Sequence, residues 1–407
     1  MTWRRFLSAA ACAATLVPCA AAHAAPPAIN APEAILVEPQ TRDVVYAKQA
    51  SMRRPIASTT KLMTALLTLE HARLTDVFTA APYSPMAGES LMGLRAGERL
   101  TVADLLRGLL IVSANDAAHT LATDVAGSQK RFVRMMNDRA RELGLRDTHY
   151  TNPVGLDEPG NYSSAADLVK LALVLRQRPF FRATTNMATA TLQSGSHVRH
   201  LQNRNDLLGL APYVNGVKTG HTNDAGFVLV GSATRDGVTV LSAVLGDQSV
   251  GARDSDTLRL LRYGLGRYRR VTPVRKGSVF GEVALKFRDD HVDLVAARTA
   301  QRIARRGERV RTTITGTPSE IEGPLAAGSR VGTILVRQRG KVVDRVPLVT
   351  EHAVAAPTLG QRLADYLGRS STRAVLVVLA LCSLYLAFLW RRLTRRRKEP
   401  EGHGLAS

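Results

Sequence analysis

The sequence predicts an α+β protein with three parts: an antiparallel sheet carrying a helical insertion, a small all-β domain, and a C-terminal transmembrane helix. Three observations support this. Apolar patterns typical of strands occur near residues 34–47 and again after residue 213, with helical patterns between them. Short alternating segments separated by turn residues fill residues 271–357. An uncharged apolar run then covers residues 374–390.

Composition narrows the classes of protein that are possible. The chain has 407 residues, 45% of them hydrophobic and 22% charged, which suits several domains with buried cores. Its formal net charge of +21 invites a nucleic-acid interpretation. No zinc-finger spacing or aromatic-rich RNA-binding pattern accompanies that charge, so we expect no nucleic-acid partner. An anionic cell surface or substrate accounts for the charge equally well.

Segments at both ends of the chain predict that the protein is exported and attached to a membrane. Residues 1–24 combine Arg4 and Arg5, an apolar Ala-rich stretch, and a small-residue cleavage site, which together indicate a signal peptide. A lipoprotein signal at Cys19 is less favoured, because Pro18 occupies the position that should hold a small residue. All three cysteines lie in the apolar end segments, so the body needs no disulfide.

The C-terminal segment predicts a single-pass anchor. Residues 374–390 would span ~26 Å at ~1.5 Å per residue, close to the thickness of a bilayer core. The basic tail, 391–407, places that end in the cytoplasm by the positive-inside rule and the body outside the cell membrane. Residues 358–373 are expected to form an amphipathic stem between body and anchor.

The first domain is expected to cover residues 28–268. Strands are predicted at 34–37 and 44–47, followed by a helix that starts near Ser58 and another near Leu100 with Thr101 as its N-cap. Further helix runs to about residue 143, an ordered loop covers 151–161, and an amphipathic helix covers 164–175. Strands at 214–220, 227–234 and 238–245 and a helix at 254–265 complete it, with Asp236-Gly237 turning the hairpin. This order predicts one antiparallel sheet built from both ends of the domain.

The second domain, 271–357, is predicted to be small and entirely β. Its expected strands cover residues 281–286, 323–327, 331–338 and 342–349.

A chemical motif begins the first long helix. Ser58 and Lys61 are three residues apart and would share a helix face near its N-terminus. A serine hydroxyl becomes a good nucleophile when a nearby base removes its proton. A lysine kept partly dry can be that base, because desolvation lowers its pKa. The alternative for these two residues alone is an N-cap serine followed by a surface lysine.

Two further short motifs follow in order, Ser113-Ala114-Asn115 and Lys218-Thr219-Gly220. Ser113 could relay a proton to a leaving nitrogen, and Asn115 could hold a substrate amide and orient Lys61. Lys218 and Thr219 could bind a substrate carboxylate, while Gly220 would let a strand lie close to the ligand. Backbone N–H groups of Ser58 and of the strand just after Gly220 would form an oxyanion hole. Each motif alone is more simply structural, but the three together predict an acyl-transfer site.

These motifs resemble those of the serine-type D-Ala-D-Ala carboxypeptidases, the low-molecular-mass penicillin-binding proteins. The resemblance extends over about residues 30–355 and includes the segments 55–61, 113–117, 151–157, 162–165 and 218–222. It implies a β-lactamase/transpeptidase-like catalytic fold, peptidoglycan stem peptides ending in D-Ala-D-Ala as substrates, and β-lactams as inhibitors. It implies catalytic roles for Ser58, Lys61 and Ser113, and substrate binding by Asn115, Lys218, Thr219, Gly220, His221 and Arg253. Gram-negative members of this family often end in an amphipathic helix on the membrane, whereas this chain ends in an apparent span with a basic tail.

Alternatives remain within the same chemistry. A class A β-lactamase needs a glutamate that activates the deacylating water, with an asparagine four residues later. Here Glu158 and Asn161 are three apart. A penicillin-acylated sensor without turnover, a transpeptidase or an endopeptidase would carry the same motifs. Scattered histidines, with only His197 and His200 close together, predict no metal site, and no cofactor is expected.

Overall fold

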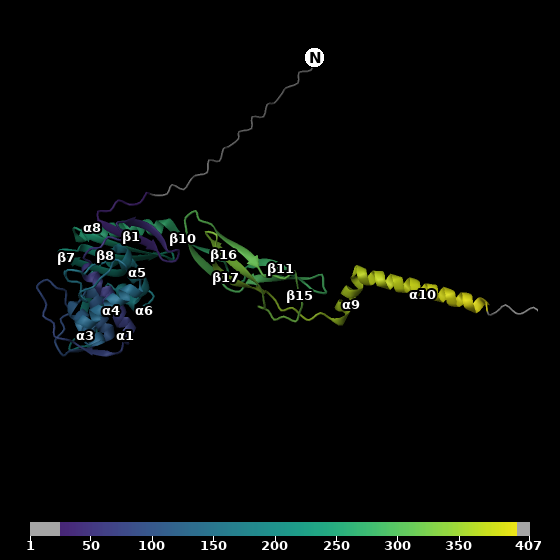
Figure 1. Ribbon diagram of the computed structural model, residues 1–407, viewed down its shortest axis with the longest axis horizontal. Helices are drawn as coiled ribbons and strands as arrows, with labels where there is room; N and C mark the ends of the chain where they lie inside the picture. The colour runs from purple at the N-terminus through teal and green to yellow at the C-terminus, as the bar shows by residue number, and fades with distance from the viewer. Residues whose placement is uncertain (1–24, 397–407) are drawn as a thin grey trace, which may run out of the picture. The chain divides into compact units, whose positions relative to one another are not determined.

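The structure is a computed structural model that describes residues 25–396 (Figure 1). The predicted signal peptide, 1–24, and the end of the predicted basic tail, 397–407, lie outside the described residues. The chain divides into two compact units. One runs to Arg270 and also includes Ile303–Glu308, and the other contains Val271–Arg302 and the chain from Arg309 onward. The predicted domain limits at 28–268 and 271–357 stay predictions.

The first unit is organised around a five-stranded antiparallel sheet of strand order β2-β1-β9-β8-β7. The predicted sheet from both ends of the domain is thereby confirmed. Asp236 and Gly237 both have positive φ, which matches the tight turn predicted between β8 and β9. The strands are β1 (Glu33–Glu38), β2 (Asp43–Lys48), β7 (Val214–Thr222), β8 (Gly226–Arg235) and β9 (Val238–Asp247). Two small two-stranded antiparallel sheets that the sequence did not predict are β3 (Val77–Thr79) with β4 (Arg99–Thr101) and β5 (Thr189–Leu192) with β6 (Arg199–Gln202).

Helices cover both faces of the sheet (Figure 1). On one face α8 (Val250–Arg267) packs its apolar side against β8 and β9. It begins four residues earlier than predicted, because the Ser249 side chain caps it by accepting from Ala252 N. On the other face α5 (Ala165–Leu175) contacts β1 and β9 and joins the helical insertion in the larger apolar core. The remaining insertion helices are α1 (Lys61–His71), α2 (Val102–Arg107), α3 (Asn115–Ala126), α4 (Gln129–Glu142), α6 (Pro179–Thr185) and α7 (Leu207–Leu210).

The second unit contains a six-stranded sheet of order β14-β16-β17-β12-β11-β15. Two further strands, β10 and β13, pair with each other, and each has residues in both units. The predicted strand at 323–327 is wrong. Pro324 cannot donate to a ladder, and only Leu325 pairs, in an isolated bridge with Val354. The strands are β10 (Tyr268–Val274), β11 (Val279–Leu285), β12 (His291–Ala296), β13 (Ala300–Arg305), β14 (Val310–Thr315), β15 (Glu320–Ile321), β16 (Arg330–Gln338) and β17 (Lys341–Thr350).

Two helices end the described chain. The predicted stem forms α9 (Leu359–Gly368), which starts in a capping box between Thr358 and Gln361. The predicted span lies within α10 (Ser370–Arg396). Residues Ser370–Thr394 are long and apolar enough to cross a membrane, and their apolar side chains are exposed.

Candidate active site

The first pair of the site is Ser58 with Lys61. Ser58 lies in a 3₁₀ turn, Ala57–Thr60, and the α-helix itself begins at Lys61, slightly later than the predicted start near Ser58. The turn is entered through Ala57, whose φ of 48° is unusual for a residue with a side chain. Lys61 Nζ lies 2.9 Å from Ser58 Oγ, and the lysine is completely buried. A base and a nucleophile therefore stand within hydrogen-bond reach of each other.

A distant loop completes the surroundings of Lys61. The Val154 carbonyl accepts a second hydrogen bond from Lys61 Nζ at 2.6 Å. The Asn152 side chain fixes that carbonyl, because its Oδ1 accepts the backbone N–H groups of Val154, Gly155 and Leu156. This confirms the predicted ordered loop. A Cβ on Gly155 would collide with the Ala57 carbonyl, so glycine allows the loop to lie against the nucleophile turn.

The second pair is Ser113 with Lys218. Ser113 follows a π-helical turn, Gly108–Val112, and has a φ of 65°. Lys218 Nζ donates to Ser113 Oγ at 2.9 Å and to the Thr219 carbonyl at 2.8 Å. Only 2% of Lys218 is exposed. A left-handed serine directly after a π-turn is a strained arrangement of the kind found at functional sites.

Burial sets the proton affinity of both lysines. Burial lowers the pKa of Lys61 well below its ordinary value, and the charge of Lys218 lowers it further. The negative charges of Glu89 and Asp116 act on that pKa in the opposite direction. Burial also lowers the pKa of Lys218 to about 7, with contributions from the charges of Arg204 and Arg253. A lysine in such a place can be neutral near physiological pH and accept a proton.

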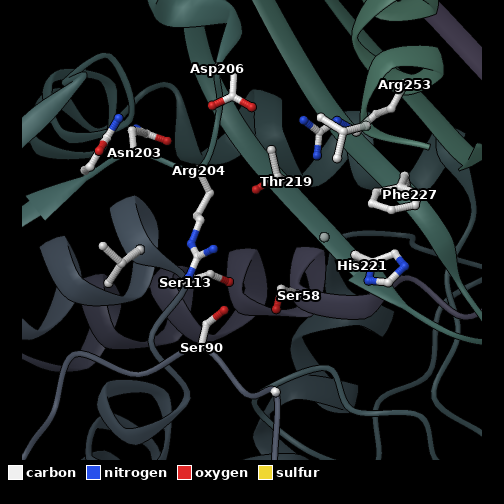
Figure 2. Close-up of a pocket in the computed structure, with 15 residues that line it drawn as sticks. Ser58, Ser90, Ser113, Asn203, Arg204, Asp206, Thr219, His221, Phe227 and Arg253 are labelled. Carbon is white, nitrogen blue, oxygen red and sulfur yellow. The ribbon is translucent and has the colours of Figure 1, made fainter.

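Ser58 and Ser113, one serine from each pair, line one cavity of about 640 Å³ (Figure 2). Its wall on the sheet side is β7, the edge strand, which carries Thr219, Gly220 and His221. A Cβ on Gly220 would lie 3.0 Å from the Ser58 backbone nitrogen, so glycine lets the strand approach the nucleophile. The lining residues are Ser58, Gly88, Ser90, Val112, Ser113, Gln202, Asn203, Arg204, Asp206, Thr219, Gly220, His221, Phe227, Val250 and Arg253.

The structure also brings the outer predicted residues to this cavity. The His221 ring stacks on Phe227 with their centroids 4.0 Å apart. Arg253, in the first turn of α8, is buried and paired with the Asp254 carboxylate at 2.8 Å while it lines the cavity. Asn115 is not among the lining residues, although it begins α3 two residues after Ser113. Its Nδ2 donates to Glu89 at 2.6 Å, and no hydrogen bond joins it to Lys61 in the described structure.

Sequence reasoning missed several residues of the wall. Arg204 points toward Ser113 in Figure 2, and its charge lowers the pKa of Lys218. Its loop is held by a hydrogen bond from the Arg204 backbone N–H to the Ile111 carbonyl. Ser90 comes from the long loop before β4, and Asp206 from the loop before α7. No motif or periodicity marks these residues, because their part in the site depends on loops that meet only in the folded chain.

Glu158 lies elsewhere. Its carboxylate accepts from Asn152 Nδ2 at 3.0 Å, and it lines a separate cavity with Tyr83, His119 and Arg134. It therefore does not face the cavity that contains Ser58, where a β-lactamase would need its water-activating glutamate. Among residues 25–396 no three or more His, Cys, Asp or Glu side chains are grouped so that they could hold a metal. The expected absence of a metal stays a prediction.

The chain matches two known families. Residues 20–249 match the peptidase S11 family, D-alanyl-D-alanine carboxypeptidase. Residues 268–356 match the C-terminal domain of penicillin-binding protein 5.

Individual relatives agree with these matches. D-alanyl-D-alanine carboxypeptidase DacD of Escherichia coli (strain K12) is 34% identical over 357 residues, which cover 84% of this chain and 91% of that protein. The crystal structure of penicillin-binding protein 5 from Haemophilus influenzae superposes with a TM-score of 0.58 at 28% identity, over 81% of this chain and 99% of that one. The Streptomyces K15 DD-transpeptidase gives a TM-score of 0.57 at 33% identity, over 59% of this chain and 99% of that one.

Proposed function

The chain belongs to the D-alanyl-D-alanine carboxypeptidase family, and we propose that Ser58 is the nucleophile with which it removes D-Ala from peptidoglycan peptides. One observation carries the assignment of residues. Three segments far apart in sequence bring Ser58 and Ser113 to one cavity and place a buried lysine Nζ 2.9 Å from each hydroxyl, Lys61 from Ser58 and Lys218 from Ser113.

Acylation is the first step. Lys61, in its neutral form, takes the proton of Ser58 Oγ, and the oxygen attacks the carbonyl of the penultimate D-Ala. The negative charge that develops on the carbonyl oxygen is held by the backbone N–H of Ser58 and one from β7 just after Gly220. The close packing of Gly220 on the Ser58 nitrogen supports this location of the oxyanion hole.

Departure of D-Ala requires a proton on its nitrogen. Ser113 relays to the leaving amine the proton that Lys61 took from Ser58, while Lys218, hydrogen-bonded to Ser113 at 2.9 Å, orients the Ser113 hydroxyl and keeps its own charge. Lys218, Thr219 and Arg253 bind the terminal carboxylate, which only a substrate with a free C-terminus carries. His221 and Phe227 form the wall beside it, so their stacked rings contact the end of the substrate.

Water then hydrolyses the acyl-enzyme and restores Ser58. A β-lactam enters the same first step, because its ring carbonyl mimics the D-Ala-D-Ala amide, and it leaves Ser58 acylated. Glu158 lies outside the cavity, so it is not placed to speed deacylation in the manner of a class A β-lactamase.

Transpeptidation is a second candidate, favoured by the likeness to a protein named as a DD-transpeptidase. It uses the same acyl-enzyme and replaces water by an amine. Glycine supplied as acceptor would distinguish the two, since a transpeptidase converts part of the substrate into a peptide ending in glycine.

We further propose that the enzyme is held at the cell membrane by α10 with its catalytic unit outside. The exposed apolar side chains of Ser370–Thr394 support this, since such a surface is unfavourable in water.

The test uses the full chain in detergent and an N-acylated Lys-D-Ala-D-Ala peptide. Release of D-Ala by the wild type, with loss of at least about 10³-fold in Ser58→Ala, supports the proposal. Ser51→Ala, at an exposed turn serine, is the control and should match the wild type. Acylation by fluorescent penicillin without D-Ala release would instead identify a penicillin sensor. Full D-Ala release by Ser58→Ala would refute the nucleophile.

A further inference from the structure

The carboxylate of Glu89 is held against the active site by hydrogen bonds that no step of the reaction uses. Gly88 and Ser90, on either side of it, line the catalytic cavity. Asn115 Nδ2 donates to Glu89 Oε2 at 2.6 Å, and the Tyr83 hydroxyl donates to the same oxygen. The Met86 backbone N–H donates to Oε1 at 2.9 Å. Both oxygens of Glu89 are therefore engaged and the carboxylate has a fixed orientation.

The loop that carries Glu89 is also tied to the first turn of α3. The Asn115 backbone N–H donates to the Ser90 carbonyl at 2.7 Å. Asp116 accepts the backbone N–H of Met92 at 3.1 Å and that of Leu94 at 2.9 Å. Two consecutive residues of α3 thus fix the position of the loop. These backbone hydrogen bonds place Glu89 beside Asn115.

This contact decides which end of the Asn115 amide is free. An asparagine amide offers two N–H donors on one side and an oxygen acceptor on the other. Glu89 accepts only, so it fixes Nδ2 on its own side and leaves the opposite end as an oxygen. Asn115 Oδ1 is buried without a hydrogen-bond partner among the described residues. An unpaired buried acceptor is costly unless a ligand or a moving ammonium satisfies it.

The charge of Glu89 acts on Lys61 as well. Lys61 has two hydrogen-bond acceptors, Ser58 Oγ and the Val154 carbonyl, and its ammonium carries three donors. Glu89 raises the pKa of Lys61, in opposition to burial and to Lys218. Burial raises the pKa of Glu89 itself, but hydrogen bonds from Asn115 and Tyr83 outweigh burial and keep it below its ordinary value. The lowered pKa favours the negatively charged form of Glu89.

We propose that Glu89 is a positioning residue of this enzyme: it orients the Asn115 amide with its oxygen available to the substrate amide and Lys61, and it supplies a negative charge that retains the proton taken up by Lys61. The hydrogen bond that the Tyr83 hydroxyl donates to Glu89 keeps the carboxylate in that position. The inference rests on the proposed function, because it assigns Lys61 the role of base. It implies that this family member tunes its lysine through a side chain outside the three motifs.

The experiment compares full-length variants in detergent. Glu89→Gln keeps an acceptor oxygen but removes the charge, and Glu89→Ala removes both. Tyr83→Phe removes only the hydrogen bond from the tyrosine hydroxyl to Glu89. Glu142→Gln is the control, an exposed carboxylate that pairs with Arg139 on α4 and lines neither cavity. Two rates are measured from pH 4 to 10: acylation by fluorescent penicillin, and D-Ala release from N-acylated Lys-D-Ala-D-Ala.

In Glu89→Gln the acidic limb of both profiles should move to lower pH, because without the negative charge Lys61 loses its proton more easily. In Glu89→Ala, kcat/KM for the peptide should fall about 10- to 100-fold, mostly through KM, because an amide that can turn no longer presents its acceptor. The kcat/KM of Tyr83→Phe should fall less than that of Glu89→Ala, and Glu142→Gln should match the wild type.

An acidic limb that stays in place in Glu89→Gln overturns the proposal. So does a kcat/KM of Glu89→Ala within twofold of the wild type. Should Glu89→Ala fail to fold, Glu89→Gln decides, since its limb must move whatever its stability. If the wild type is acylated by penicillin but releases no D-Ala, the proposed function fails, whereas the acylation profile of Glu89→Gln still decides the role of Glu89.

Discussion

Lys218 Nζ donates to Ser113 Oγ at 2.9 Å, although the two residues lie 105 positions apart in sequence. Lys61 Nζ lies at the same distance from Ser58 Oγ, so each of the two serines is hydrogen-bonded to a different lysine. Both lysine side chains are buried, and the charge of Lys218 lowers the pKa of Lys61. The roles proposed for them differ: Lys61 has to be neutral to take a proton, while Lys218 has to be charged to hold a carboxylate.

The first prediction concerns pH. The pKa of Lys61 is lowered by burial, so kcat/KM should rise with pH as Lys61 loses its proton. The pKa of Lys218 is about 7, so its charge is lost above that pH and KM should then rise. The expected profile of kcat/KM is a bell whose alkaline limb, near pH 7 to 8, appears in KM rather than kcat. A rate that still climbs above pH 9 would show that the charge on Lys218 is not needed.

The second prediction concerns the close approach of β7 to the nucleophile. The added Cβ in Gly220→Ala would lie 3.0 Å from Ser58 N and 3.1 Å from Ala57 Cβ. The strand must then shift away, and the oxyanion donors lose their spacing. Acylation by fluorescent penicillin should slow by about 10²-fold, comparable to loss of an oxyanion-hole donor.

The control for that change is Gly266→Ala, at an exposed position of helix α8, where an added Cβ meets nothing within 4 Å. It should acylate at the wild-type rate and be equally or slightly more stable, because alanine favours helix. Equal acylation rates for both variants would contradict the proposed place of Gly220 in the oxyanion hole.

The third prediction separates binding from chemistry. Arg253→Ala removes a buried guanidinium from the cavity wall but leaves Ser58 and Lys61 untouched. We expect KM for the D-Ala-D-Ala peptide to rise about 10-fold or more while kcat falls little, since charge-assisted hydrogen bonds to a carboxylate are worth about 1.5–3 kcal/mol. Steady-state kinetics measures both constants.

Arg259→Ala is the matched control on the same helix. Its side chain is half-exposed and paired with Asp256, away from the cavity. If KM changes equally in the two variants, Arg253 acts through helix stability and has no specific part in binding the carboxylate.

The fourth prediction concerns the anchor. Removing residues 370–407 should move the protein from the membrane fraction to the soluble fraction while kcat/KM on the free peptide stays within about threefold, because α10 contributes no residue to the cavity. Fractionation followed by a D-Ala release assay measures both. Retention of the truncated protein on the membrane would assign attachment to another part of the chain, with α9 and its exposed Leu359 the first segment to test.

Predictability varied with how local each feature is. The N-cap role of Thr101 was predicted and is confirmed, because a cap depends on residues three apart, here Thr101 and Asp104. The hairpin of β8 and β9 was likewise predicted from Asp236-Gly237. The strand β14 (Val310–Thr315) was missed, because most of its side chains are exposed and its order comes from pairing with β16. Residues 323–327 were wrongly predicted to form a strand, because the sequence does not show which segments pair with them. Only Leu325 pairs, in an isolated bridge with Val354.

The sequence by itself determined which reactive side chains are present: those of the motif that starts at Ser58 and of the motifs at Ser113 and Lys218. It also determined their order along the chain. It also determined the alternation that makes the sheet, since apolar periodicity is a property of the chain. Only the tertiary structure decided that Lys61 would meet Val154, that Arg204 would enter the cavity, and that Glu89 would hold Asn115. The physical reason is that pKa values and hydrogen-bond orientation depend on burial and on neighbours from distant segments, and no local pattern records which segments those are.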